Sequence, residues 1–179
     1  MKEGLRMNAG SGRVVKELLE TVIIALILAF FVRSFVVESF VVDGRSMEPT
    51  LINHERLFVN KFIYRFQSPS RGDVVVFRYP RDPSRDFIKR IIGLPGETIE
   101  IRSGVVFIQG IALEESYITN LPPGSMTERI VPEGHVFVLG DNRSNSEDSR
   151  FFGYLPQVNI KGKAFMVYWP TENLRMIRN

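Results

Sequence analysis

Apolar residues form one unbroken run near the start of this chain and only short runs after it. The unbroken run covers residues 22–32 and reads VIIALILAFFV. With its flanks, from residue 18 to residue 37, it reaches roughly the 20 residues that a membrane-spanning helix needs. Glu20 and Arg33 interrupt it near its two ends, where long side chains reach the membrane surface. We therefore predict a transmembrane anchor over residues 18–37.

The basic residues before this run predict its orientation. Lys2, Arg6, Arg13 and Lys16 precede it, and the positive-inside rule then makes residues 1–17 a cytoplasmic segment. Residues 38–179 would form an extracytoplasmic domain of a single-pass cell-membrane protein. A removable signal peptide is the main alternative, but the sequence after the run, RSFVVESF, has no small-x-small cleavage site. A buried helix of a soluble domain is disfavoured because the run has no polar face.

Beyond residue 40 the pattern is typical of strands. Short runs of β-branched and aromatic residues are separated by Gly and Pro, and Ser103-Gly104 predicts a hairpin turn. The predicted strands cover residues 35–37, 40–42, 74–77, 87–92, 98–102, 105–108, 135–139 and 164–169. We find no repeat and no low-complexity segment. The predicted fold class is mainly β: one transmembrane helix followed by an all-β domain of barrel or coiled-sheet type.

Composition narrows the possible chemistry. The 179 residues suffice for one domain plus an anchor. Cysteine is absent, which excludes disulfides, thiolate metal sites and a cysteine nucleophile, and two histidines are too few for a His-rich metal centre. The net charge of +3 fits proximity to anionic lipid but is too small and scattered for nucleic acid. We expect a lipid bilayer as a partner, and no metal, cofactor or nucleic acid.

Ser46 lies in the run DGRSMEPTL, directly after the predicted anchor. Gly44 permits a tight turn and Pro49 fixes φ three residues further on, so Ser46 is expected to be exposed on a rigid turn. Most serines in such a position are ordinary turn residues. Serine becomes a nucleophile only when a base takes its proton.

The familiar serine–base arrangements are not found in this sequence. His54 lies in a polar turn and His135 begins a predicted strand, and neither context recommends a catalytic base. The G-x-S-x-G elbow fails because Glu48 stands at the second glycine position, and no Ser-x-x-Lys occurs.

Lys89 remains as a candidate base. In a strand, Phe87, Lys89 and Ile91 share one face, which places an ammonium group among apolar neighbours. Desolvation would lower the pKa of Lys89, and a neutral lysine acts as a general base near neutral pH. The alternative is a surface lysine on an edge strand.

The polar run GDNRSNSEDSR covers residues 140–150. A solvated loop is one alternative. A calcium loop is another, but the EF-hand pattern fails at Arg143 and lacks its glycine. A functional alternative is that a serine hydroxyl orients the lysine amine while an Asp–Arg pair braces the loop.

Taken together, these motifs resemble those of the bacterial type I signal peptidases. The nucleophile motif is SMEPTL (46–51), the structural strand is RGDVVVF (71–77), the lysine motif is KRIIGLPGE (89–97) and the C-terminal motif covers 140–150. Their order, spacing and preceding anchor match from about residue 18 to residue 169. Gram-negative members carry serine at the position of Gly44, so the chain is similar to the Gram-positive, single-anchor form.

The resemblance implies a signal-peptidase or LexA-like catalytic domain and a role for each residue. Ser46 would attack the scissile carbonyl with Lys89 as general base, and Ser146 would hydrogen-bond to Lys89. Asp148 and Arg150 would buttress the site, with Asp141 and Arg90 as a supporting ion pair. The Ser46 N–H would supply part of the oxyanion hole. Gly44 offers no hydroxyl, which leaves the second donor to a water or another backbone N–H.

The same resemblance implies that the partners are exported preproteins, cleaved after a small-x-small motif. An extended substrate would pair with strand edges. The candidates for shallow apolar pockets are also plain core candidates: Phe40, Val42, Met47, Leu51, Phe87 and Ile88. Two alternatives share this fold, a LexA-like self-cleaving protein and a membrane-anchored, non-enzymatic β module.

Overall fold

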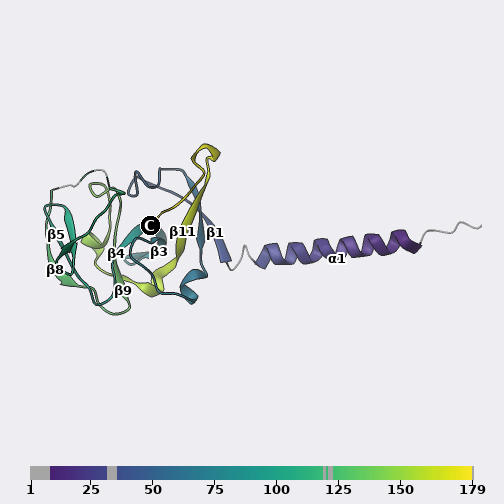
Figure 1. The fold of residues 1–179 in the computed structure, drawn as a ribbon, viewed down its shortest axis with the longest axis horizontal. Coiled ribbons are helices and arrows are strands. Elements are labelled where there is room, and N and C mark those ends of the chain that lie inside the picture. The colour runs from purple at the N-terminus through teal and green to yellow at the C-terminus, as the bar shows by residue number, and fades with distance from the viewer. Residues whose placement is uncertain (1–8, 32–35, 119, 121–122, 179) are drawn as a thin grey trace, which may run out of the picture. The chain divides into compact units, whose positions relative to one another are not determined.

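The computed structural model describes residues 9–31, 36–118, 120 and 123–178. The chain divides into two compact units, Met1–Val36 and Val37–Asn179, with the boundary close to the predicted domain start at residue 38 (Figure 1).

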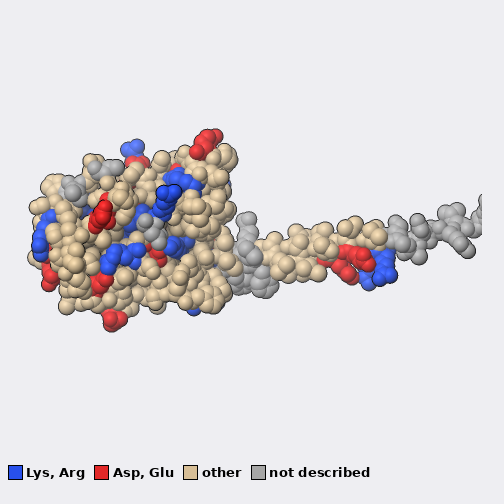
Figure 2. All heavy atoms as spheres, viewed as in Figure 1, with Lys and Arg blue, Asp and Glu red and all other residues tan. Residues whose placement is uncertain are grey.

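The first unit contains helix α1, Ala9–Phe31. Its charged side chains gather in its first half (Figure 2), where Arg13 pairs with Glu17 at 3.2 Å and Lys16 with Glu20 at 3.8 Å, one helical turn apart. Among the residues that the structure describes, no helix is both long enough and apolar enough to cross a membrane. The predicted span 18–37 includes residues 32–35, which lie outside the described part of the chain.

The second unit is mainly β, as predicted. Its larger sheet has the strand order β1-β2-β11-β3-β4-β9-β10, with β12 paired to β11, and neighbouring strands are antiparallel. The strands are β1 Val37–Val41, β2 Arg56–Asn60, β3 Val74–Tyr79, β4 Asp82–Gly93, β9 His135–Leu139, β10 Leu155–Pro156, β11 Ile160–Trp169 and β12 Arg175–Met176. Strand β2 was not predicted, because its sequence RLFVN begins and ends on polar residues.

A smaller sheet is made from the contiguous stretch between β4 and β9. Its order is β7-β6-β5-β8, with β5 Thr98–Arg102, β6 Val105–Ile108, β7 Ile111–Ala112 and β8 Met126–Ile130. The predicted hairpin between β5 and β6 is confirmed: Ser103 and Gly104 have φ of 48° and 85°, the left-handed values that a tight hairpin turn requires. Because β4 and β9 pair directly, the smaller sheet is an excursion that leaves the larger one intact.

The core of the larger sheet centres on β3. Its residues Val74, Val75, Val76 and Phe77 are all buried, since β3 lies between β11 and β4 with apolar clusters on both faces. Such a strand reads as a continuous apolar run rather than an alternating one. The helical pieces are short: α2 Ser149–Phe152, η2 Ile63–Arg65, η3 Gln157–Asn159 and η4 Thr171–Asn173. Strand β4 therefore holds residues 89 and 90 in the middle of a rigid sheet.

Candidate active site

The predicted nucleophile lies on a turn that follows β1. Gly44 has φ of 97°, a left-handed conformation that favours glycine, and its N–H donates to Asn53 Oδ1 at 2.9 Å. Two residues on, Ser46 is half-buried. The turn thus presents the Ser46 hydroxyl at a fixed place beside β4.

The Lys89 amine lies directly against that hydroxyl. Nζ donates to Ser46 Oγ at 2.7 Å and to the Ile88 carbonyl at 2.8 Å. Lys89 is only 4% exposed, and its Nζ lies 5.2 Å from the centre of the Phe87 ring. The structure therefore brings together the two residues on which the predicted chemistry depends.

Burial changes the acidity of this amine. Desolvation lowers the pKa of Lys89 from 10.5 to about 8, because the charged form loses its hydration. The negative charges of Asp148, Glu147 and Asp141 act in the opposite direction and favour the ammonium. The neutral form of Lys89, which can accept a proton, is therefore accessible near pH 8.

Hydrogen bonds to backbone carbonyls fix the 140–148 loop to the Ser46 turn. The Asn142 N–H donates to the Ser46 carbonyl at 3.0 Å, and Asn142 Nδ2 donates to the Arg45 carbonyl at 3.0 Å. Gly140 approaches the same carbonyl so closely that an added Cβ would lie 2.4 Å from it. Sequence reasoning missed both residues, and their only signal was their place in the polar run.

Ser146 differs from the prediction. Its hydroxyl oxygen is buried and has no hydrogen-bond partner in the described part of the chain, so the expected bond to Lys89 is not made in this structure. The amine is instead directed at Ser46 and Ile88. Ser146 packs against Gly140, where a Cβ would lie 2.2 Å from Ser146 Oγ.

Asp148 and Arg150 form the expected ion pair. Arg150 Nε and Nη2 reach Asp148 Oδ1 and Oδ2, each at 2.8 Å, and the Asp148 side chain is fully buried. Asp148 also accepts the Gly140 N–H at 3.0 Å and caps helix α2 through the Arg150 N–H. The Asp148 carboxylate thus joins the two ends of the loop.

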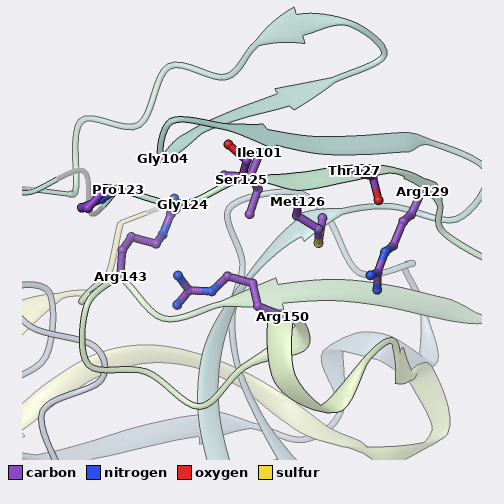
Figure 3. A pocket seen from close by; sticks show the side chains of 10 residues that line it. All are labelled: Ile101, Gly104, Pro123, Gly124, Ser125, Met126, Thr127, Arg129, Arg143 and Arg150. Carbon is purple, nitrogen blue, oxygen red and sulfur yellow. The ribbon is translucent and has the colours of Figure 1, made fainter.

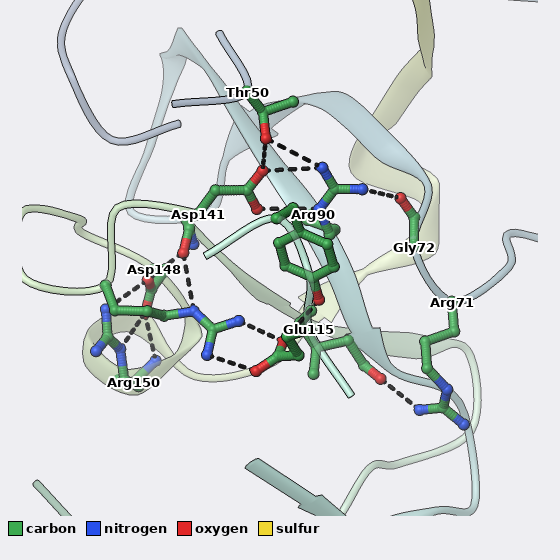
Figure 4. Close-up of polar contacts among 12 residues, drawn as sticks. Thr50, Arg71, Gly72, Arg90, Glu115, Asp141, Asp148 and Arg150 are labelled. Atoms are coloured by element: carbon green, nitrogen blue, oxygen red, sulfur yellow. Dashed lines mark hydrogen bonds and ion pairs between the residues drawn. The ribbon is translucent and has the colours of Figure 1, made fainter. Parts of the chain in front are cut away.

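Arg90, in β4, and Asp141, in the 140–148 loop, form the second expected pair (Figure 4). Nε reaches Oδ1 at 3.0 Å and Nη2 reaches Oδ2 at 2.8 Å, with the side chains 1% and 0% exposed. Thr50 donates to Asp141, Arg90 donates to the Gly72 carbonyl, and the Arg90 guanidinium lies 4.0 Å over the Tyr117 ring. With its hydrogen-bonding groups satisfied, this buried pair ties β4 to the loop.

Ser46 and Lys89 line a groove of about 600 Å³. Four predicted pocket residues line it with them: Phe40, Val42, Phe87 and Ile88. Two others, Met47 and Leu51, were wrong as pocket residues: they are 1% and 0% exposed and belong to the core cluster. They share that cluster with Leu57 and Val59 of β2 and do not line the groove.

A second cavity, of about 410 Å³, lies beside the smaller sheet (Figure 3). Arg129, Arg143 and Arg150 line it, and Arg143 is held by a buried ion pair with Glu115. Neither Ser46 nor Lys89 lines it. Across the described ranges, no three His, Asp or Glu side chains converge as metal ligands would.

A serine hydroxyl held against a buried amine in a groove defines a hydrolase-like site, and comparison with known proteins supplies the family. The family model described as "Signal peptidase, peptidase S26" matches residues 15–169. The chain belongs to this family.

Individual relatives narrow the type. A probable signal peptidase I-1 of Synechocystis sp. is 42% identical over 165 residues, 88% of this chain and 84% of the relative. Signal peptidase I P of Bacillus subtilis subsp. natto is 40% identical over 169 residues, 88% of this chain and 90% of the relative. A solved signal peptidase I of Enterococcus faecalis is 36% identical, with a TM-score of 0.47 over 54% of this chain and 97% of that one. The family model and the two signal peptidase I relatives make the chain a hydrolase of the bacterial signal peptidase I type.

Proposed function

We propose that this chain is a membrane-anchored serine endopeptidase that removes signal peptides from exported preproteins, cutting after a small-x-small motif. Ser46 is the nucleophile and Lys89 is the general base. The observation that carries the proposal is the 2.7 Å contact between Ser46 Oγ and an amine that is only 4% exposed. Neither histidine lines the groove with Ser46, and His135 Nδ1 lies 2.9 Å from the Glu133 carbonyl.

Lys89 Nζ accepts and then donates a proton in each half of the reaction. With Lys89 neutral, the Ser46 hydroxyl donates to Nζ, which takes the proton as Oγ attacks the scissile carbonyl carbon. The resulting ammonium returns that proton to the leaving amine, which leaves an acyl-enzyme. A water molecule then gives a proton to Lys89 and attacks the ester carbonyl carbon. As the ester bond breaks, Lys89 passes that proton to Ser46 Oγ, which restores the serine hydroxyl and the neutral amine. The Ile88 carbonyl holds one amine hydrogen, which orients the nitrogen lone pair toward Ser46.

The oxyanion of the tetrahedral intermediate needs donors near Ser46. The Ser46 N–H is one donor, because it lies next to the attacked carbonyl. Gly44 has no side chain, and its own N–H is already bonded to Asn53. The second donor is therefore a water or another backbone N–H.

The groove suits an extended peptide. It runs between the end of β1, at residues 40–42, and the segment of β4 at residues 85–89. Strand β1 is at the end of the strand order, so an added strand pairs along it. The apolar side chains that line the groove leave shallow room for small residues at the −1 and −3 positions.

The membrane is the remaining part of the proposal. The apolar run over residues 18–37 and the basic residues before it support a single-pass anchor, with residues 1–17 in the cytoplasm and residues 38–179 outside. Such an anchor confines enzyme and preprotein to one bilayer surface and raises their effective concentration. Alkaline carbonate extraction of cell membranes tests the anchor. The full wild-type chain should stay in the membrane, and the double variant Ile24→Arg/Leu28→Arg should be released from it. The control variant Val158→Arg, which changes the β unit, should stay in the membrane like wild type.

Cleavage of a model preprotein by the full chain in detergent tests the chemistry. Wild type should cut after a small-x-small site, Ser46→Ala and Lys89→Ala should lose the activity, and Ser144→Ala should keep it, because Ser144 is an exposed hydroxyl in the same loop. Near-full activity in Lys89→Ala would refute the Ser/Lys mechanism. An inactive wild type would favour the non-enzymatic module, and cutting of the chain itself alone would favour the self-cleaving protein.

A further inference from the structure

Glu147 stands at the mouth of the groove with an unusual partner. It lines the groove together with Ser46 and Lys89, and its carboxylate accepts a hydrogen bond from the Tyr79 hydroxyl. Among the described residues no lysine or arginine pairs with it. An exposed glutamate is thus held in one place by a neutral group.

Tyr79 is a rigid support for this contact. It is 5% exposed, its ring stacks on Phe87 at 4.3 Å with an interplanar angle of 10°, and the edge of Phe152 packs on it at 5.6 Å. The hydrogen bond to Glu147 raises the pKa of Tyr79, so the hydroxyl remains a donor. Phe87 in turn lies 5.2 Å from Lys89 Nζ. The glutamate and the lysine are therefore fixed by the same aromatic pair.

The other charges around Lys89 are largely compensated. Asp148 pairs with Arg150 at 2.8 Å, Asp141 with Arg90 at 2.8 Å, and Asp86 with Lys161 at 2.6 Å. The remaining charged residues that line the groove are Asp43, Arg45, which pairs with Glu48 at 3.3 Å, and Arg85, which lies over the Phe87 ring. The charges of Arg81 and Arg85 also act on the Tyr79 hydroxyl that holds Glu147. Of the three carboxylates whose field acts on Lys89, only Glu147 lacks a cation partner in the described part of the chain.

We infer that Glu147, anchored by Tyr79, is a positioning residue whose carboxylate, held in no ion pair in the described part of the chain, shifts the pH range in which Lys89 exchanges a proton with Ser46. This rests on the proposed function of Lys89. In that function the amine must first take a proton and then return it to the leaving group, which works best when both forms are accessible near the working pH. Burial alone favours the neutral form, and Glu147 offsets part of that preference.

Two substitutions separate the effect of the Glu147 charge from that of the Tyr79 hydrogen bond. Glu147→Gln removes the charge but keeps an oxygen that accepts from Tyr79, and Tyr79→Phe keeps the ring stack but releases the carboxylate. The measurement is the pH dependence of kcat/KM for peptide cleavage at low ionic strength, where charge effects are least screened. Glu172→Gln, at an exposed position in η4, is the control.

Removing the charge should move the rising limb of the profile to lower pH. A move of about half a pH unit corresponds to about threefold higher kcat/KM on the acid side. Glu147→Gln should show this shift, Tyr79→Phe a shift in the same direction and no larger, and Glu172→Gln none. If Glu147→Gln leaves the limb in place while Lys89→Ala is inactive, this inference is wrong and the proposed function stands. Activity in Lys89→Ala would instead overturn both.

Discussion

Gly140 follows β9 beside the carbonyl of Ser46, and a side chain there has no room. A Cβ would lie 2.4 Å from Ser46 O and 2.2 Å from Ser146 Oγ. Ordinary carbon–oxygen contacts begin at about 3.3 Å. The Ser46 carbonyl would therefore have to move by roughly 1 Å in Gly140→Ala, away from a loop to which the Asn142 N–H now ties it.

This displacement reaches the chemistry directly. Ser46 Oγ and Lys89 Nζ are 2.7 Å apart, and a shift of about 1 Å takes them to the limit of hydrogen bonding. Misplacement on this scale costs on the order of 10²-fold in rate. We expect Gly140→Ala to lower kcat about 10²-fold and the free energy of unfolding by about 1–3 kcal/mol, the usual cost of overpacking. Peptide cleavage and urea unfolding of the purified full chain measure the two.

Gly162→Ala provides a matched control. Its Cβ would lie 2.4 Å from the Asn60 carbonyl, an equally close backbone clash, but on the β2 side of β11 and not at the Ser46 turn. It should lose stability similarly and keep most of its kcat. A folded Gly140→Ala protein with a kcat within threefold of wild type, or an equal loss of kcat in both variants, would refute this reasoning.

Four other outcomes are expected. Only neutral Lys89 accepts a proton, and its pKa is lowered to about 8. In a plot of kcat/KM against pH, the rising limb should therefore have its midpoint near pH 8. A midpoint near 10.5 would contradict this. Lys89 binds its proton more tightly in the unfolded chain than in the folded one, so the free energy of unfolding should increase from pH 8 to 10.5 in wild type. It should not do so in Lys89→Met. Urea unfolding at several pH values measures both. Asp141→Ala should lower the free energy of unfolding by roughly 3–5 kcal/mol, because it leaves the buried Arg90 unpaired. Arg102→Ala, which breaks an exposed pair, should lower it by less than about 1 kcal/mol. Equal losses would contradict a special role for the buried pair. Met47→Ala should lower the free energy of unfolding by roughly 2–5 kcal/mol and leave the cleavage site in the substrate unchanged. If mass spectra of the products showed a new cleavage site, Met47 would contact the substrate in the groove after all.

The strands could be predicted where their sequence pattern is simple. The run at residues 74–77 is apolar on both faces because β3 is central, and the hairpin at Ser103-Gly104 needs the left-handed conformations that these two residues adopt. Strand β2 was missed because Arg56 and Asn60 sit at its ends, so its alternation of Leu57 and Val59 toward the core is too short to detect. Tertiary pairing, rather than local preference, makes that segment a strand.

The site was less predictable than the fold, for geometric reasons. Burial of Lys89 followed from its apolar neighbours, but the hydroxyl partner of its amine depends on side-chain direction, and Ser146 was not that partner. Met47 looked like a pocket residue because core and pocket residues are equally apolar. Asn142 acts partly through its backbone N–H, which every residue except proline has, so that part of its role left no trace in the sequence.

The contacts among Ser46, Lys89 and Asn142 have a consequence for the stage of folding at which activity appears. They join segments far apart in the chain: Ser46 and Lys89 are 43 positions apart, and β4 pairs with β9 across the whole smaller sheet. Contacts of such long range form late, since the entropy of closing large loops must be overcome first. A partly folded chain has neither the desolvated amine nor the fixed hydroxyl, so under the proposed mechanism it has no working nucleophile. The protein therefore gains its capacity to cut peptides only when its own loops are already folded away from attack.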